Sequence, residues 1–246
     1  HRHGGGVSGA AVARQMLTSL GLTVSDMVAD GEQVSAGQRL ICAHGNAAAL
    51  HQGWKAVQNV LEWSCGVSGY LESMLSQLRQ RYPDGQIACT RKAIPGTRSL
   101  ATQAILAAGG IIHRGGCAET VLLFANHRRF LTSPNDWTNA VARLRSHAPE
   151  KKIVVEADTP DEALAALRAA PDVLQLDKFT PEQATDIARL APSLAPHCTL
   201  ALTGGITLAS LASYLDCGIR LFITSAPYYA PPADIKVSLS PDARGI

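Results

Sequence analysis

From residue 86 onward, short apolar segments rich in β-branched residues alternate with segments of helical periodicity. Buried strands that alternate with helices build a parallel sheet through right-handed crossovers. The sequence therefore predicts an α/β protein, as either an open doubly wound sheet or a closed barrel. The expected strands are residues 86–90, 121–124, 153–157, 173–177, 199–203 and 219–224.

Helix-start patterns agree with this alternation. Residues 159–162 (TPDE) and 180–183 (TPEQ) both have the pattern of a capping box with proline at the first helical position. Ser133-Pro134 is expected to begin another helix.

The chain before residue 86 has a different organisation. An amphipathic helix is expected at residues 10–20, followed by short extended segments within 24–44. Two further helices, at 46–64 and 67–82, are expected to join near Gly66. The chain enters its first helix almost at once, so we expect the first strands of this part to be missing upstream.

Composition limits the classes of function. The chain has 246 residues, 46% of them hydrophobic, enough for one large domain or two smaller ones. A net charge of +2 gives no reason to expect nucleic acid or a membrane surface as a partner. No apolar run approaches the ~20 residues of a membrane span, and no signal peptide is visible. The six scattered cysteines favour a reducing compartment, so we expect a cytoplasmic protein that binds small molecules.

Polar residues follow several of the expected strands. In parallel α/β folds, ligands bind at the carboxyl ends of the strands. Arg91, Lys92, His113 and Arg114 form a cluster of donors that could hold a carboxylate or a phosphate, with Arg98 nearby in the sequence. The alternative is a solvated loop with surface cations.

Two carboxylates, Glu156 and Asp177, interrupt otherwise apolar strands, where an unpaired charge would be costly to bury. They could pair with Lys92 or hold Mg²⁺, which takes one or two carboxylates together with substrate phosphates. A purely structural ion pair across the strand ends is the alternative.

The segment Thr203-Gly204-Gly205 follows an expected strand and precedes an expected helix. Glycine lets the backbone approach a ligand closely, and a helix N-terminus offers N–H groups to a phosphate. The alternative is a tight turn between strand and helix.

Taken in order, six segments resemble the quinolinate phosphoribosyltransferase family (nicotinate-nucleotide pyrophosphorylase, carboxylating). These segments are TRKAIPGTR, GGIIHRGG, VLLFANH, IVVEADTPDEA, VLQLDKFTPE and LTGGIT. The resemblance implies an open α/β barrel of six to seven parallel strands, preceded by a smaller sandwich-like α/β domain. It places the N-terminal domain at 1–68, the barrel at 69–230, and a tail that returns to the N-terminal domain at 231–246. It also implies a homodimer with sites shared between subunits, or a higher oligomer.

The resemblance further implies a role for each site residue. Arg91, Lys92, His113 and Arg114 would line the pocket for an acidic acceptor and phosphoribosyl diphosphate, with Lys92 in a catalytic role. Glu156 and Asp177 would lie by the ribose and the Mg²⁺-diphosphate as catalytic and metal-binding residues. Phosphate binding would fall to Thr203, Gly204, Gly205 and Ser225.

Three departures from the family pattern bear on the substrate. Phe124 stands where the family usually has a lysine, Lys55 replaces an arginine contributed across the dimer, and Ser225 replaces a usual glycine. Lysine does not reproduce the bidentate geometry of arginine. These changes resemble a subgroup named for molybdenum transport, and they predict a less anionic or more aromatic acceptor than quinolinate.

Two functions from different classes follow. The first is an enzyme, a pentosyltransferase that moves phosphoribosyl to a ring nitrogen of quinolinate or a related acidic heterocycle. The second is a non-catalytic protein that binds a phosphate, an oxyanion or a nucleotide in connection with molybdate transport.

Overall fold

The computed structural model describes residues 1–241, which divide into two compact units. The first unit comprises residues 1–72, 93–110 and the chain from 227 onward. The second comprises 73–92 and 111–226.

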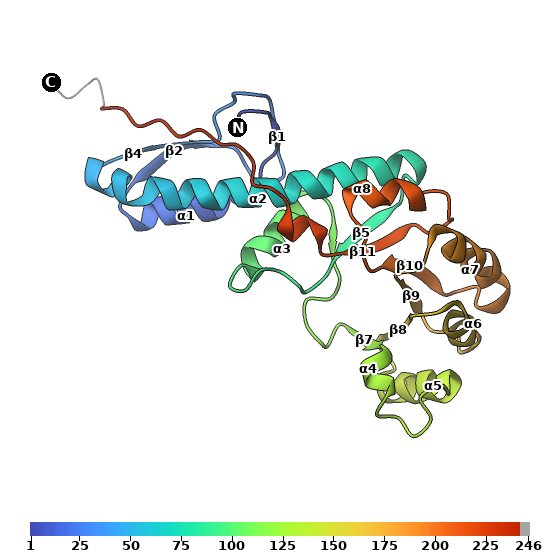
Figure 1. Cartoon of the computed structure of the whole chain (residues 1–246). Helices are drawn as coiled ribbons and strands as arrows, with labels where there is room; N and C mark the ends of the chain where they lie inside the picture. The colour runs from blue at the N-terminus through green and yellow to red at the C-terminus, as the bar shows by residue number, and fades with distance from the viewer. Residues whose placement is uncertain (242–246) are drawn as a thin grey trace. The chain divides into compact units, whose positions relative to one another are not determined.

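The second unit is built on a seven-stranded parallel sheet (Figure 1). Its order, β6-β5-β11-β10-β9-β8-β7, begins and ends with strands that are consecutive in sequence, so the barrel is open between β6 and β7. All six strands expected from the sequence are present, and the two-residue β6 was not expected. The strands are β5 (Gln86–Cys89), β6 (Ile111–Ile112), β7 (Thr120–Leu123), β8 (Lys152–Ala157), β9 (Val173–Asp177), β10 (Thr199–Thr203) and β11 (Leu221–Thr224).

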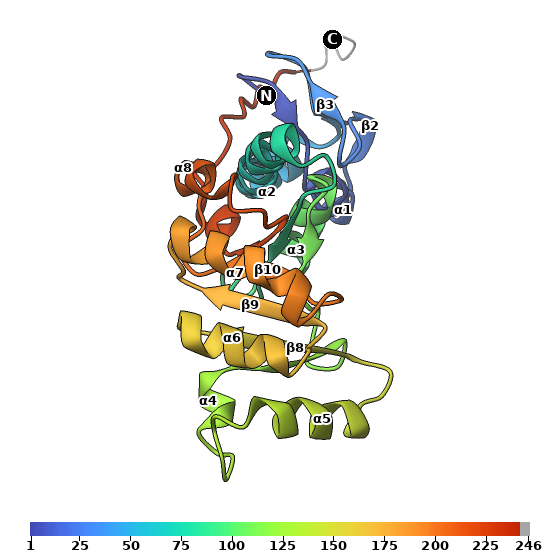
Figure 2. The same cartoon turned by 90° about the vertical axis from the view of Figure 1, so that its right-hand side faces the viewer.

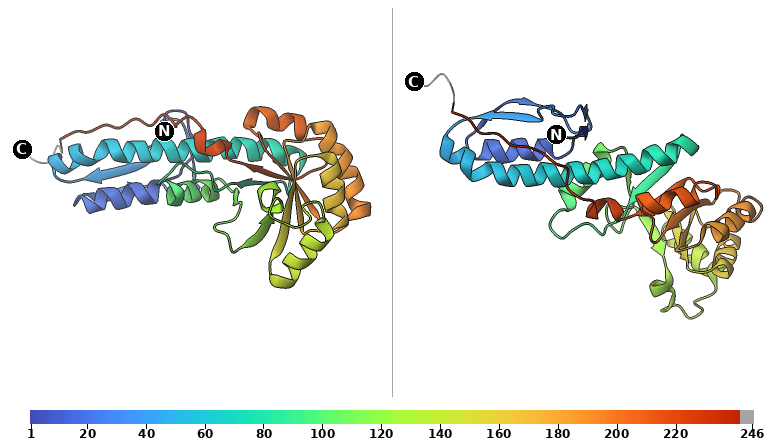
Figure 3. Two further views of the ribbon diagram at one scale, coloured as in Figure 1. Left: turned by 60° about the horizontal axis from the view of Figure 1, so that its bottom comes forward. Right: turned by 45° about the horizontal axis from the view of Figure 1, so that its top comes forward.

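Helices cover the outer side of this sheet. Helices α5 (Trp137–His147), α6 (Pro160–Arg168) and α7 (Pro181–Leu194) lie in a row along the strands (Figure 2), and form an arc outside them in the left view of Figure 3. The side chains of Thr159 and Thr180 both cap their helices by accepting hydrogen bonds from the amides three residues later. Only 180–183 form the complete capping box, because Glu162 accepts from the amide of Asp158 instead of that of Thr159. The short helices are α4 (Ala125–Arg128) and α8 (Leu208–Leu211), with 3₁₀ turns at Ala212–Tyr214 and Ala226–Tyr229.

The expected helix start at Ser133-Pro134 is wrong by a few residues. Helix α5 begins at Trp137, and Asp136 caps it by accepting a hydrogen bond of 3.1 Å from the amide of Asn139. A carboxylate cap also suits the positive end of the helix dipole, so Asp136 replaces the serine as the capping residue.

The strand register decides which side chains share the inner face of the sheet. We define this face by the buried cluster of Ala88, Ala201 and Ile223. Gln175 pairs with Ala201 on one side and with Glu156 on the other. Because paired residues of neighbouring strands point the same way, these two polar side chains also belong to the inner face.

The first unit contains helix α1 (Ala10–Ser19), helix α3 (Arg98–Ala107) and residues 47–72 of α2 (Ala47–Arg81). Two small antiparallel sheets complete it, β1 (Gly5–Gly6) with β3 (Gln33–Val34) and β2 (Thr23–Met27) with β4 (Ile41–His44). This is the smaller sandwich-like α/β part that the family resemblance implied. Its core includes Val7, Ala10, Ala13, Leu17, Leu22, Leu40, Val57, Leu61 and Ile235.

The expected break near Gly66 does not exist, because α2 is one helix of 35 residues. A Cβ at Gly66 would lie 2.3 Å from the carbonyl oxygen of Pro231. Glycine is present here to let the C-terminal segment approach the helix, and not to turn the chain.

The C-terminal segment is bound to α2 within the first unit. The amide of Ala233 donates to the carbonyl of Glu62 at 2.8 Å, and the side chain of Gln58 donates to the carbonyl of Ile235 at 2.7 Å. Residues 242–246 of the expected tail lie outside the described residues. Within residues 1–241, no helix combines the length and apolar character needed to cross a bilayer.

Candidate functional site

Most residues singled out from the sequence lie on the carboxyl ends of the strands of the second unit. We call this edge the rim. Because all seven strands are parallel, their carboxyl ends meet at one edge of the sheet. The rim carries Arg91 and Lys92 after β5, His113 and Arg114 after β6, Phe124 after β7, Glu156 in β8, Asp177 ending β9, Thr203, Gly204 and Gly205 at β10, and Ser225 after β11.

Carboxylates dominate the β8–β9 side of the rim. Burial, followed by the charges of Asp177 and Asp158, raises the pKa of Glu156 from 4.5 to about 7, against the opposing effect of Lys92 and Lys178. Burial and the charges of Glu162 and Asp177 also raise the pKa of Asp158. An arrangement that raises carboxyl pKa values is not a simple ion pair, so it favours a role in binding or chemistry.

Backbone strain accompanies these charges. Lys178, directly after Asp177, has φ 57°, and Arg114, directly after His113, has φ 55°. Left-handed backbone costs a residue other than glycine about 1–2 kcal/mol. The amide of Lys178 donates to the carbonyl of Thr203 at 2.9 Å, and this bond holds the turn beside the glycines. Strain that the surroundings maintain is commonly found at functional sites.

The cationic side of the rim is organised around Arg91. Its Nη1 donates to the carbonyl of Gly116 at 3.1 Å and lies 3.0 Å from the Sγ of Cys117. The hydrogen bond and charge of Arg91 lower the pKa of this exposed thiol. Arg91 is thus connected to the segment that bridges the open side of the barrel, between β6 and β7.

His113 differs from the other members of the donor cluster because it is not a cation at neutral pH. Burial, and then the charge of Arg114, lower the pKa of His113 to about 4. Its Nε2 lies 3.1 Å from Nε2 of Gln175, and its backbone amide donates to the carbonyl of Cys89 at 2.8 Å. The ring is therefore a fixed, neutral group among charged ones.

The two glycines after β10 have different roles. Both have left-handed backbone, with φ 80° at Gly204 and 81° at Gly205. A Cβ at Gly204 would lie 2.3 Å from Oδ1 of Asp177, whereas a Cβ at Gly205 would meet no atom within 4 Å. Gly204 lets the turn pack against the carboxylate, and Gly205 leaves open space at the rim.

The helix after this turn offers less to a phosphate than expected. Helix α8 has four residues, and the hydroxyl of Thr207 already accepts from the amide of Ser210 at 3.1 Å. The capping residue, and not a ligand, satisfies this amide, so the helix N-terminus does not support the phosphate assignment.

Ser225 is hydrogen-bonded to Thr90 through the two side-chain hydroxyls. Thr90 Oγ1 also accepts from the amide of Lys92 at 3.2 Å. Ser225 therefore fixes the start of the segment that carries Arg91 and Lys92. This contact links two strand ends that are far apart in the sequence.

Phe124 marks the end of β7 and precedes α4. Its ring centroid lies 4.2 Å from that of His127, whose Nδ1 accepts from the Phe124 amide at 3.4 Å. Behind it, the buried Arg128 pairs with Glu162 at 3.0 Å and lies over the ring of Trp137 at 4.1 Å. Glu162 in turn accepts from the amide of Asp158 at 3.0 Å, so this network supports the carboxylate side of the rim.

Two cations named from the sequence belong to the first unit. Lys55 lies on α2, where its Nζ donates to Gln58 at 2.9 Å and lies 5.3 Å from the ring centroid of Trp54. Arg98 is the first residue of α3. The rim of the second unit contains neither of them.

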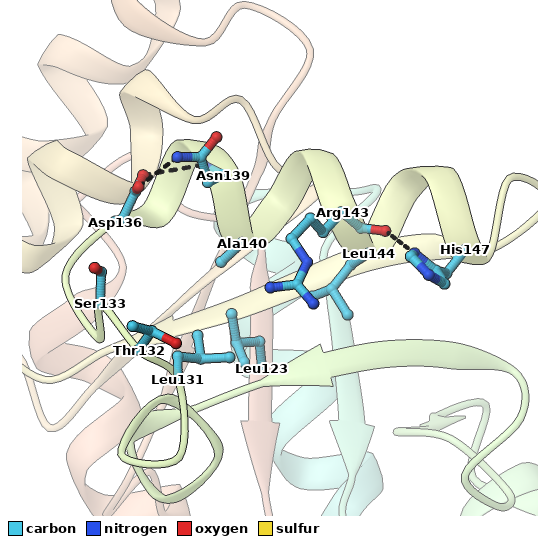
Figure 4. A pocket seen from close by; sticks show the side chains of 10 residues that line it. All are labelled: Leu123, Leu131, Thr132, Ser133, Asp136, Asn139, Ala140, Arg143, Leu144 and His147. Carbon is cyan, nitrogen blue, oxygen red and sulfur yellow. Dashed lines mark hydrogen bonds between the residues drawn. The ribbon is translucent and has the colours of Figure 1, made fainter.

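A cavity of about 430 Å³ lies beside α5 and the end of β7 (Figure 4). Several of its polar groups are engaged within the helix itself. Asp136 accepts from Asn139, and Nδ1 of His147 is 2.8 Å from the carbonyl of Arg143. None of the predicted site residues lines it, so its size does not make it the functional site.

Sequence reasoning assigned no role to several residues at the rim. Thr90 and Gln175 form hydrogen bonds with predicted site residues, and Asp158 and Lys178 act on the charge of Glu156. Only Gln175 gave a usable signal, as a polar residue inside an apolar strand and two positions before Asp177, on the same face.

An open parallel barrel with carboxylates, guanidinium groups and a glycine turn on its carboxyl rim defines a class of proteins that bind anionic small molecules at that edge. Comparison with known proteins identifies the family. Sequence profiles of the quinolinate phosphoribosyl transferase N-terminal and C-terminal domains match residues 1–65 and 67–238. The chain belongs to the quinolinate phosphoribosyl transferase family.

Individual relatives agree with this assignment. The Escherichia coli O157:H7 protein named "Putative pyrophosphorylase ModD" is 77% identical over 242 residues, which cover 98% of this chain and 85% of the relative. The carboxylating nicotinate-nucleotide pyrophosphorylase of Dictyostelium discoideum is 31% identical over 87% of this chain and 75% of its own. The solved nicotinate-nucleotide pyrophosphorylase of Francisella tularensis has the same fold, with a TM-score of 0.84 at 22% identity over 94% of this chain and 81% of its own.

Proposed function

We propose that this protein transfers the phosphoribosyl group of phosphoribosyl diphosphate to a ring nitrogen of an acidic heterocycle related to quinolinate. One observation carries the proposal. The carboxylates Glu156 and Asp177 lie on the same rim as Lys92, close enough for their charges to act on one another. A protein that only binds an anion has no need for two carboxylates beside the cations.

The chemistry requires groups of both signs. As the diphosphate leaves C1 of the ribose, that carbon becomes cationic, and the ring nitrogen of the acceptor attacks it. Glu156 and Asp177 stabilise the cationic centre and orient the ribose hydroxyls, while Lys92 stabilises the leaving diphosphate. Arg91 and Arg114 hold the acidic groups of the substrates. Glu156 acts as an anion only when ionised, so activity is expected to rise with pH up to about 7, the pKa of its carboxyl group.

The residues fit a magnesium ion shared with the substrate. Glu156 and Asp177 supply two carboxylates at the ends of neighbouring strands. Residues 1–241 contain no group of three or more His, Cys, Asp or Glu side chains arranged to hold a metal, so further ligands would be water and diphosphate oxygens. When bound, Mg²⁺ supplies charge neutralisation for the diphosphate.

Phe124 carries the proposal about the acceptor. Its apolar ring stands beside His127, where the family pattern has a lysine. An aromatic side chain in this place favours an acceptor with fewer anionic groups, or a more apolar one, than quinolinate. The ModD name of the relatives supports a link to molybdenum uptake as part of the same proposal.

Phe124→Lys tests the acceptor assignment. The added ammonium group should raise quinolinate-dependent activity several-fold, chiefly by lowering KM, because it restores a cation for the second carboxylate. Phe124→Leu removes the ring without adding charge and serves as the control. An unchanged KM in Phe124→Lys would argue against this role for position 124.

The assembly and the location of the protein are also part of the proposal. We propose a homodimer in which Lys55 reaches the rim of the partner subunit. All six cysteines are unpaired, which supports a cytoplasmic protein.

The decisive experiment measures diphosphate release from phosphoribosyl diphosphate and Mg²⁺, with and without quinolinate. Quinolinate-dependent release would support the transfer directly. If quinolinate does not support diphosphate release, another acid with a ring nitrogen should do so when a panel of such acids is screened. No diphosphate release with any acid of the panel would overturn the proposal.

The second candidate is a protein that binds a phosphate or an oxyanion such as molybdate without turnover. Two features favour this candidate: Ser225 is hydrogen-bonded to Thr90, and Phe124 is present. Ser225 stands where the family usually has a glycine and Phe124 where it has a lysine, and both positions serve substrate binding in the family. Binding of molybdate or phosphate in the absence of any diphosphate release would favour this candidate.

A further inference from the structure

Gln175 is a buried polar residue that the proposed mechanism does not use. It lies in β9 with 2% of its surface exposed, on the inner face between Glu156 and Ala201. Removing a side-chain amide from water is costly unless it is hydrogen-bonded. The hydrogen-bond partner of the Gln175 amide therefore decides whether its burial is costly.

That partner is His113, which directly follows β6 at the far end of the strand order. Nε2 of Gln175 lies 3.1 Å from Nε2 of the His113 ring. Three strands, β10, β11 and β5, lie between β9 and β6 in the sheet order, so this bond crosses the inner face. Two of the three contribute only a methyl group to the buried cluster there, from Ala201 and Ala88, which leaves room for the longer side chains.

The end of the amide that faces the ring sets the direction of the bond. It is the nitrogen of Gln175, which only donates, so Nε2 of His113 accepts. A ring that accepts at Nε2 is neutral and carries its proton on Nδ1. We propose that Gln175 is a positioning residue that fixes His113 as the neutral Nδ1–H tautomer, so that the rim offers its substrate a neutral hydrogen-bond donor there instead of a fourth cation.

The surroundings of the ring agree. Burial and the adjacent charge of Arg114 oppose protonation of His113, whose pKa is about 4. The backbone amide of His113 is held by the carbonyl of Cys89 at 2.8 Å, so the ring extends from a fixed main chain. Gln175 and the main chain together leave one orientation of the ring.

For substrate recognition, the inference rests on the proposed function. A neutral N–H group can donate a hydrogen bond to a carboxylate, a carbonyl or a ring nitrogen without adding positive charge to the pocket. Together with Phe124, it points to a heteroaromatic acceptor with fewer acidic groups than quinolinate, because neither position 113 nor position 124 supplies a cation for a second carboxylate.

The first test needs neither substrate nor mutation of Gln175. Nitrogen and carbon chemical shifts distinguish the two neutral tautomers and the imidazolium form. They are recorded for the eight histidines of the full chain, and the signals of His113 are assigned by their loss in His113→Gln. We expect the Nδ1–H tautomer throughout pH 6–8. The Nε2–H tautomer or a charged ring would overturn the proposal.

The second test reverses the hydrogen bond. In Gln175→Glu the side chain accepts, so His113 should change to the Nε2–H tautomer or become charged, while Gln175→Met should abolish the preference for one tautomer. Gln86→Glu, the same substitution at the opposite end of the barrel, is the matched control and should leave the ring unchanged. Thermal unfolding shows which variants are folded. A folded Gln175→Glu that keeps the Nδ1–H tautomer would also contradict the proposal.

Kinetics then separate positioning from a general loss of structure. In Gln175→Glu, KM for the acceptor should change by tenfold or more, while KM for phosphoribosyl diphosphate changes less. If no acceptor supports diphosphate release, the proposed function fails, yet the tautomer measurements still decide the role of Gln175.

Discussion

The two ends of the barrel differ in how they treat charge. At the amino ends of the strands, Arg220 pairs with Asp84 at 2.9 Å and Arg145 with Asp172 at 3.6 Å. At the carboxyl ends, Glu156 lies near two further carboxyl groups, and its pKa rises to about 7. The same strands therefore carry an end where opposite charges pair and an end where carboxylates remain close together, as expected of a functional site.

The largest effect is expected from Glu156→Gln. Loss of the carboxylate should lower turnover by more than tenfold, towards the roughly hundredfold typical of removing one group that stabilises a transition state. The measurement is diphosphate release with an accepted substrate. Asp84→Asn is the matched control at the amino end and should leave turnover unchanged. A Glu156→Gln enzyme as active as the wild type would remove Glu156 from the mechanism.

Stability should respond to pH with an unusual sign. Between pH 4.5 and about 7, the unfolded chain releases the proton of Glu156 while the folded protein retains it, so folding loses stability as pH rises. The full effect is about 3 kcal/mol, from a pKa that rises from 4.5 to about 7. The free energy of urea unfolding, compared between wild type and Glu156→Gln at pH 5 and pH 8, isolates this residue. Parallel pH curves for the two proteins would contradict the assignment.

The glycine pair allows a comparison within the rim itself. Alanine at either position must adopt left-handed backbone, which costs about 1–2 kcal/mol. Gly204→Ala should cost about 2 kcal/mol more than Gly205→Ala, because only its Cβ collides with Asp177. Chemical unfolding measures both. Equal losses would mean that both Asp177 and the backbone of Lys178 can move away without cost.

The smallest effect is expected at the amino end. Asp84→Asn removes an exposed ion pair with Arg220, and such pairs contribute about 1 kcal/mol or less. The loss should shrink further in high salt. Its thermal unfolding should therefore differ little from the wild type, and a loss of several kcal/mol would show that the amino end is more than a set of surface pairs.

Much of the fold could be predicted from the sequence because its strands are apolar runs separated by capped helices. Two features could not. Strand β6 has only two residues and no periodicity to detect, and Gly66 resembles a helix break unless the Pro231 carbonyl beside it is known. Both depend on contacts between segments far apart in the chain, which local patterns do not contain.

The candidate site shows the same division. The positions of Glu156 and Asp177 could be predicted from the sequence, because both residues lie near the ends of expected strands. The parallel topology alone brings those strand ends to one edge of the sheet. The neutrality of His113 could not be predicted, because it depends on burial and on an amide sixty-two residues away. The short α8 also escaped prediction, since the cap at Thr207 satisfies the amide that a phosphate was expected to bind.

The hydrogen bond between Thr90 and Ser225 has a consequence for folding. It joins residues 135 positions apart, directly after β5 and directly after β11, whereas β8, β9 and β10 follow one another in the sheet with a single helix between each pair. Closing so long a loop carries an entropic cost, and contacts of high sequence separation slow folding. The pairing of β5 with β11 is expected to be a late event, so the chain completes the rim only in the last steps of folding. A chain stalled before that step would have most of its sheet and would lack the complete rim that the proposed function requires.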